Sequence, residues 1–145
     1  MRTLKRIIIG FCLILAIAIL PFVINPVINN IRLANFSRQI YTHSLPMQTK
    51  ILEKQSICGK LNGNGDGMDF LATILIKSDL SLEDLQKYYS FATVIKQDGV
   101  TLKDDCVENR ELKYSALNNI NNYEGYYVVY IYDGGYPALF DIRGA

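Results

Sequence analysis

The segment Met68–Lys77 (MDFLATILIK) carries the clearest secondary-structure pattern in this chain of 145 residues. Its apolar residues recur at every second position, which places them together on one face of a β-strand: Met68, Phe70, Ala72, Ile74 and Ile76. Leu71 and Leu75 fall on the opposite face. Because both faces are apolar, we expect a central strand that is covered on both sides.

The segments on either side of this strand also have clear patterns. Ile51–Leu61 has the composition of a strand, and the loop Asn62–Gly67 (NGNGDG) separates it from Met68, which predicts a hairpin. After the strand, Ser81 is a suitable N-cap with Asp84 three positions later, so a helix is predicted from Leu82.

The second half of the chain is predicted to be mostly strand. Five segments have suitable composition: Thr93–Gln97, Val100–Leu102, Glu111–Leu117, Tyr126–Tyr132 and Tyr136–Ile142. For Glu111–Leu117 a helix is the alternative. Asp98-Gly99 and Asp133-Gly134 lie between two pairs of them and favour two-residue hairpin turns. The order of elements predicts an α+β domain with a small, mostly antiparallel sheet and one packed helix.

The N-terminal segment differs sharply from this domain. Ile7–Ile24 (IIIGFCLILAIAILPFVI) is 18 residues long and contains no charge and no amide. As a helix it spans roughly 27 Å, close to the hydrocarbon core of a bilayer at about 30 Å. We therefore expect residues 1–24 to be a transmembrane anchor that contacts the lipid bilayer through residues 7–24.

The distribution of basic residues predicts the orientation of this anchor. Three of them precede the apolar run (Arg2, Lys5 and Arg6), whereas the next one is Arg32. The positive-inside rule then places the N-terminus in the cytoplasm and the rest of the chain outside, as in a single-pass protein of the cell membrane. The alternative is a signal peptide cleaved at Ala16-Ile17-Ala18, although cleavage there would leave the apolar residues 19–24 as a new terminus.

The region after the anchor is expected to form a separate helix. Asn25-Pro26 interrupts the apolar run, and Val27–Tyr41 then has helical composition. We expect residues 25–46 to be a juxtamembrane stalk helix that packs on the domain, and residues 47–145 to form the extracytoplasmic α+β domain.

The composition of the exported part excludes some classes of protein. Residues 25–145 hold 54 hydrophobic residues among 121, an ordinary fraction for one globular domain. Their 12 basic and 14 acidic residues give a net charge of −2, which argues against a nucleic-acid partner bound by a basic surface.

The glycine-rich loop contains the weak candidates for a metal site. Asn62, Asn64 and Asp66 place oxygen atoms at alternate positions, as in the first half of a calcium-binding loop, and Asp69 adds a second carboxylate nearby. However, position one is an asparagine and position twelve is Thr73, which cannot provide a bidentate carboxylate. A hairpin turn that uses Asn and Gly for positive φ, or an anion-binding nest of backbone N–H groups, are the alternatives.

The cysteines and the single histidine are the remaining reactive groups. Cys58 and Cys106 are the only cysteines outside the apolar run, so a disulfide between them is possible, with a buried thiol as the alternative for Cys58. An enzyme using either thiol with His43 would require the stalk junction to fold back over the sheet. No motif for a cofactor is present, and we expect no cofactor and no enzymatic activity.

Tyrosines gather near the end of the sequence. Tyr126, Tyr130 and Tyr132 share one face of a predicted strand, and Tyr127, Val129 and Ile131 share the other. The second set is the expected core face. The first set is then either a half-exposed interaction surface or a layer that packs against the stalk helix.

Three segments resemble a group of small bacterial proteins with a single membrane span, to which no activity is assigned: Ser56–Lys77, Leu82–Tyr89 and Gly125–Arg143. The resemblance implies a membrane location and brings no catalytic residues. The function expected from the sequence is a non-enzymatic interaction or accessory module whose partner is another membrane or envelope protein. The alternative is a ligand- or calcium-binding sensor domain that uses the Asn62–Asp69 loop.

Overall fold

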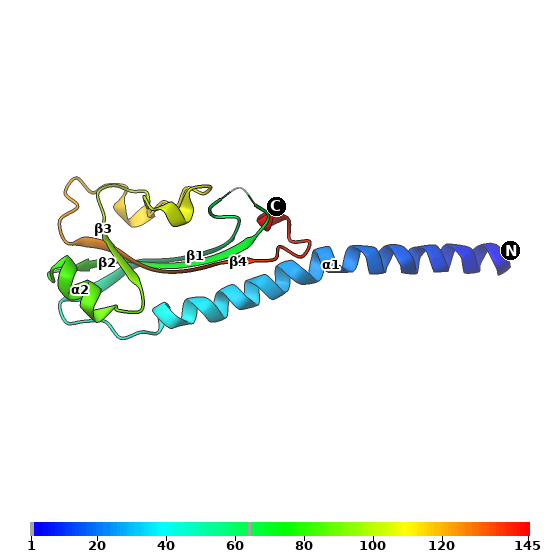
Figure 1. Ribbon diagram of the computed structural model, residues 1–145, viewed down its shortest axis with the longest axis horizontal. Coiled ribbons are helices and arrows are strands. Elements are labelled where there is room, and N and C mark those ends of the chain that lie inside the picture. The colour runs from blue at the N-terminus through cyan, green and yellow to red at the C-terminus, as the bar shows by residue number, and fades with distance from the viewer. Residues whose placement is uncertain (1, 64) are drawn as a thin grey trace.

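The computed structural model describes residues 2–63 and 65–145, and it consists of one long helix and a small sheet (Figure 1). The elements follow in the order α1 (Arg2–Tyr41), β1 (Thr49–Gly59), β2 (Met68–Ser78), α2 (Leu82–Tyr88), β3 (Thr93–Lys96) and β4 (Tyr126–Tyr136). Three short 3-10 turns lie at Asp105–Val107, Ser115–Leu117 and Ile142–Gly144. The predicted α+β class is confirmed.

The sheet is open and antiparallel throughout, with the strand order β1-β2-β4-β3. The predicted hairpin joins β1 to β2, and β2 is central as expected, since Lys77 is its only exposed residue. The predicted cap of α2 is also confirmed, because the Ser81 hydroxyl accepts a hydrogen bond of 3.1 Å from the Asp84 N–H.

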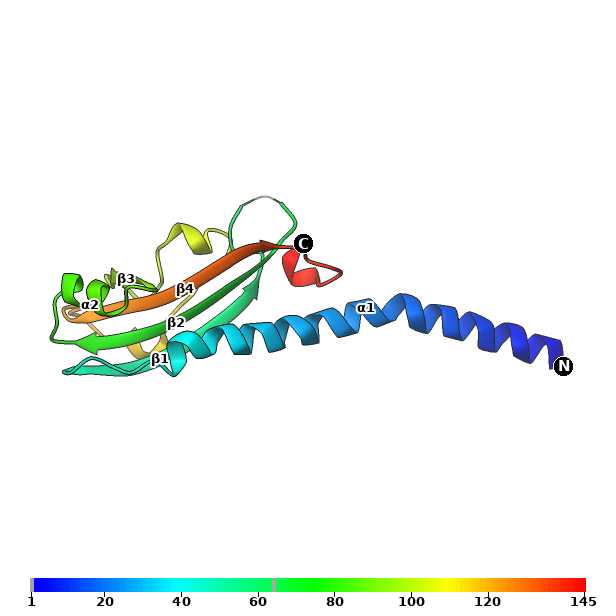
Figure 2. The same ribbon diagram turned by 60° about the horizontal axis from the view of Figure 1, so that its bottom comes forward.

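The two faces of the sheet are covered in different ways (Figures 1 and 2). The C-terminal half of α1 and the short α2 pack on one face, against alternate residues of β2 and β4: Ala72, Ile74, Ile76, Tyr127, Val129 and Ile131. Residues 97–125 cover the other face without any long regular element. The period-two alternation of β2 thus predicted both core faces correctly.

The expected break between anchor and stalk is wrong, because α1 runs through both Pro21 and Pro26 without ending. A proline inside a helix removes the hydrogen bond to the carbonyl four residues earlier and bends the axis, but it need not end the helix. At the second proline the helix also contacts the end of the chain, because the Arg143 guanidinium donates a hydrogen bond of 3.1 Å to the Pro26 carbonyl. The anchor and the predicted stalk are therefore two halves of one element.

The expected turn at Asp133-Gly134 is also wrong. Strand β4 continues through both residues to Tyr136, which pairs with Met68 of β2 across a register shift. The buried Asp69 carboxylate accepts a hydrogen bond of 3.1 Å from the Gly135 N–H at this irregularity. Pairing with a long neighbouring strand has overridden the local turn preference, and a 3-10 turn at Ile142–Gly144 replaces the end of the predicted returning strand.

The predicted strands Val100–Leu102 and Glu111–Leu117 reduce to a single bridge between Thr101 and Lys113, followed by a 3-10 turn. The buried Gln97 stands where the predicted hairpin would begin. Its side-chain amide donates to the Gly99 and Thr101 carbonyls at 2.7 and 2.8 Å, so these carbonyls bond to a side chain at the turn.

Candidate functional site where α1 leaves the domain

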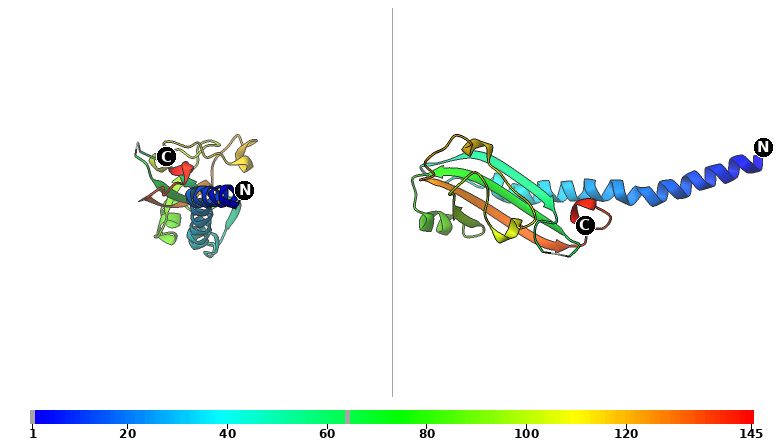
Figure 3. Two further views of the ribbon diagram at one scale, coloured as in Figure 1. Left: turned by 90° about the vertical axis from the view of Figure 1, so that its right-hand side faces the viewer. Right: turned by 90° about the horizontal axis from the view of Figure 1, so that it is seen from above.

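The N-terminal half of α1 has no protein around it. None of the residues from Leu4 to Ile24 is buried, whereas burial begins at Asn29 and is complete at Ile40. The exposed half projects well beyond the sheet in two views (Figures 2 and 3). By its length and composition the helix is able to cross a membrane, and it lies near the N-terminus.

The C-terminal segment of the chain meets α1 where the helix leaves the domain. The rings of Phe22 and Phe140 lie 5.2 Å apart, between centroids. The Asn25 side-chain amide donates a hydrogen bond to the Leu139 carbonyl. The end of the apolar run is therefore in direct contact with residues more than 100 positions later in the sequence.

A charged pair fixes this contact. The buried Asp141 carboxylate accepts hydrogen bonds from the Asn29 amide at 2.9 Å and from the Arg143 guanidinium at 2.9 and 2.7 Å. Arg143 also donates to the Asn30 side-chain oxygen at 2.7 Å. The bonds from Arg143 outweigh the effect of burial and lower the pKa of Asp141 to about 2. Asp141 is consequently ionised at neutral pH and acts as a structural anion rather than as an acid or base.

Backbone contacts hold the segment from its other side. The Lys60 N–H donates to the Arg143 carbonyl at 2.7 Å, and the Gly67 N–H donates to the Gly144 carbonyl at 2.8 Å. Gly59 has a φ of 148°, and a Cβ atom there would meet the Arg143 carbonyl oxygen at 2.8 Å. The segment is thus fixed between α1 and the loop that joins β1 to β2.

The predicted metal residues do not gather around one point. The Asp69 carboxylate accepts hydrogen bonds from the N–H groups of Leu61 at 3.0 Å and Asn62 at 3.4 Å, besides the one from Gly135. Asp66 is exposed, and Asn64 lies outside the described residues. Within residues 2–63 and 65–145, no three His, Cys, Asp or Glu side chains are grouped so that they could hold a metal ion. The loop is supported from within by Asp69.

The two predicted disulfide partners lie in different parts of the core. Cys58 packs with Met68 and Phe70 on the α1 side of the sheet, and Cys106 belongs to the cluster on the other side. Both thiols are free and buried, so the structure does not contain the possible bridge. Burial raises the pKa of Cys58, and burial together with Asp104 raises that of Cys106 to about 12, which disfavours the reactive thiolate.

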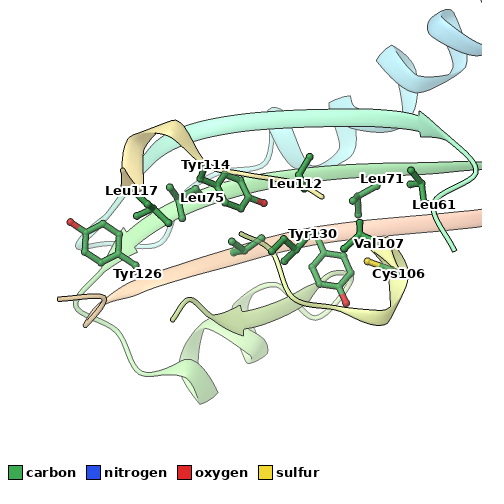
Figure 4. Close-up of a cluster of buried hydrophobic side chains, with 12 residues drawn as sticks. Leu61, Leu71, Leu75, Cys106, Val107, Leu112, Tyr114, Leu117, Tyr126 and Tyr130 are labelled. Carbon is green, nitrogen blue, oxygen red and sulfur yellow. The ribbon is translucent and has the colours of Figure 1, made fainter. Parts of the chain in front are cut away.

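The tyrosine face predicted as an interaction surface is covered. Tyr126 and Tyr130 are buried in the cluster beneath residues 97–125 (Figure 4). Tyr132 is partly buried and packs against the same cluster. The Tyr130 hydroxyl donates a hydrogen bond of 2.7 Å to the Asp104 carboxylate. An irregular segment covers these rings, a possibility that strand periodicity could not reveal. Packing is therefore correct for Tyr126 and Tyr130, but the predicted packing partner is wrong, because α1 packs on the opposite face, against Tyr127, Val129 and Ile131.

His43 lies among aromatic side chains. Its ring is 5.6 Å from those of Tyr88 and Tyr89 and 4.7 Å from that of Phe91. Neither cysteine belongs to this group, so the structure does not support a Cys–His pair.

Comparisons with protein-family models, with curated proteins and with solved structures find no match to this chain. The site at the base of α1 was not predicted from the sequence. One pattern in the sequence does point to it, because Asn25 and Asn29 lie one helical turn apart directly after an apolar run and need polar partners. The partners themselves, Asp141 and Arg143, could not be found without the fold.

Proposed function

We propose that this chain is a single-pass membrane protein that holds a small α+β domain at the outer face of the cell membrane as a non-enzymatic interaction or accessory module. The continuity of α1 is the observation that carries this proposal. The exposed apolar half has the length of a bilayer span, and the other half is part of the folded domain.

A continuous helix gives the domain a defined position relative to the bilayer. A flexible linker would allow the domain to move freely, whereas here Asp141 and Arg143 tie the helix to the sheet directly after the apolar run. The domain therefore sits close to the membrane surface and is held in a fixed orientation relative to α1. This arrangement suits a module that presents one surface to a neighbour in the envelope.

The end of the domain opposite to the anchor is the surface that we propose for such a neighbour. Leu45 and Met47 are exposed there to 39% and 87%, and Tyr88 and Phe91 to 37% and 45%. His43 joins the two aromatic side chains into one cluster. Exposed aromatic and methionine side chains are enriched in protein–protein interfaces.

Labelling of substituted cysteines in intact bacterial cells tests the topology. The full chain is expressed with Thr3→Cys or Asn119→Cys and treated with a membrane-impermeant maleimide. We expect Asn119→Cys to react in intact cells and Thr3→Cys only after lysis. The unsubstituted chain is the matched control, because Cys58 and Cys106 are buried and Cys12 lies in the apolar run. Recovery of the chain in the soluble fraction, or labelling of Thr3→Cys in intact cells, would overturn the proposal.

A further inference from the structure

The loop from Pro137 to Ile142 exposes a second apolar surface. Leu139, Phe140 and Ile142 are exposed to 54%, 60% and 80%, and Phe22 of α1 is exposed to 51% beside them. We call these four residues the apolar loop patch. Its members come from two regions far apart in sequence and meet only because the chain ends its last strand next to α1.

The backbone of this loop holds the apolar side chains in an unusual conformation. Leu139 and Phe140 have φ values of 47° and 68°, which residues other than glycine rarely adopt. The conformation is fixed by the bond from Asn25 to the Leu139 carbonyl and by the Asp141 N–H, which donates to the Ala138 carbonyl at 2.9 Å. A strained loop that exposes large apolar side chains points to a contact that these side chains make outside the domain.

We infer that the apolar loop patch is a second membrane contact, which inserts into the lipid of the outer leaflet beside the anchor. The inference rests on the proposed function, because it requires the apolar half of α1 to span the bilayer. Phe22 is two residues before the end of the run at Ile24, or about 3 Å along the helix axis. Since the Phe140 ring lies 5.2 Å from the Phe22 ring, Phe140 must lie at the boundary between headgroups and acyl chains.

Lipid, rather than a protein, is the occupant that the surroundings favour. The patch is continuous with the helix surface that would face acyl chains, so any protein covering it would have to enter the same layer. Residues 137–140 carry no charge, and the nearby Asp141 is neutralised by Arg143. Asp66 lines the hollow between Phe22 and the loop, and its carboxylate would limit the insertion to the headgroup level.

The contact would determine the rotation of the domain about the anchor. One helix fixes the distance of a domain from the bilayer but leaves its rotation about the helix axis free. A second contact on one side of the helix determines which face of the sheet turns toward the membrane. The opposite end of the domain, with Met47 and Phe91, then points away from the lipid.

Fluorescence quenching by brominated lipids tests this contact directly, because the chain contains no tryptophan. The full chain is reconstituted in nanodiscs of phosphatidylcholine. The acyl chains of this lipid carry bromine atoms close to the headgroup. Three single-tryptophan variants are compared: Phe140→Trp in the patch, Phe22→Trp in the anchor, and Phe91→Trp at the opposite end. Each replaces an exposed phenylalanine, so the three changes are closely matched in size and chemistry.

We expect the emission of Phe22→Trp and Phe140→Trp to shift to the blue and to lose most of its intensity, and that of Phe91→Trp to remain unquenched. Quenching of Phe22→Trp without quenching of Phe140→Trp would overturn the inference and leave the anchor intact. Failure of Phe22→Trp to be quenched would overturn the proposed function itself. Quenching of all three would also contradict the inference, because the whole domain would then lie on the lipid. Circular dichroism of each variant verifies that it has folded.

Discussion

The two halves of α1 have nearly the same helical geometry and opposite environments. Ile14 in the first half is 69% exposed, and Ile40 in the second half is completely buried against β2, β4 and α2. The same type of side chain is therefore exposed at one end of the helix and enclosed by the sheet at the other. The boundary between the halves is formed by Asn25, Asn29 and their partners near residue 141.

The difference shows how one helix can carry two kinds of surface. The apolar run of the first half has apolar side chains on every side, which suits the membrane span that we propose. The second half carries polar residues between its apolar ones and packs one side on the sheet. Since no loop separates the halves, the proposed span and the domain would be joined by one continuous helix.

The largest effect is expected when the first half is made polar. Leu13→Arg combined with Ile17→Arg places two charges at the centre of the apolar run. Each charge should raise the free energy of membrane insertion by about 2.5 to 3.5 kcal/mol. We expect the full chain to move from the membrane fraction to the soluble or degraded fraction. Fractionation followed by immunoblotting measures this, with Leu13→Ala combined with Ile17→Ala as the control that should stay in the membrane. Retention of the double arginine variant would show that the first half is not the anchor.

The second half should respond to the opposite kind of change. Ile40→Ala removes a fully buried side chain and should lower the free energy of unfolding by about 2 to 5 kcal/mol. Ile14→Ala, the same substitution in the exposed half, should leave it unchanged. Denaturant titration of the full chain in nanodiscs, followed by tyrosine fluorescence, measures both. An equal loss of unfolding free energy in Ile40→Ala and Ile14→Ala would mean that the two halves of α1 do not differ in how they contribute to the folded domain.

The joint between the halves should be sensitive to both mutation and pH. Asp141→Ala leaves Arg143 and Asn29 without their partner and should lower the free energy of unfolding by about 2 to 3 kcal/mol. The loss is smaller than for breaking a fully buried ion pair, because Arg143 is 32% exposed. Asp98→Ala is the control, since its ion pair with Lys103 is exposed and should contribute less than about 1 kcal/mol.

The pKa of Asp141 also predicts the acid limit of this stabilisation. Its folded-state pKa of about 2 lies below the unfolded value of about 3.9, so the unfolded chain binds the proton first as the pH falls. The stabilisation is complete above roughly pH 4 and is lost as the pH falls toward 2. The free energy of unfolding of the unsubstituted chain should fall across this pH range, and this fall should be absent from Asp141→Ala. An identical pH dependence in both proteins would mean that another group titrates there.

The same comparison explains which predictions from the sequence succeeded. Periodicity and capping act over a few residues, so the sequence predicted β2 and the cap at Ser81 correctly. By contrast, α1 runs past Pro26 where Arg143 contacts the Pro26 carbonyl, and β4 runs past Asp133 where the Gly135 N–H contacts Asp69. These contacts join residues separated by 117 and 66 positions, and no local pattern contains them. The candidate site was missed for the same reason.

The smallest effect is expected at the loop that supports the joint from the other side, where the Gly67 N–H holds the Gly144 carbonyl. If Asp66 and Asp69 bound calcium, the ion at 100 times its dissociation constant would raise the stability by about 2.7 kcal/mol. We expect no change in Tm across millimolar calcium, because both Asp69 oxygens already accept backbone N–H groups. Thermal unfolding of the full chain in nanodiscs with calcium or with a chelator measures the difference. A rise in Tm that Asp66→Ala abolishes would instead make this loop a ligand site next to the anchor, so that calcium would act directly on the joint between the two halves of α1.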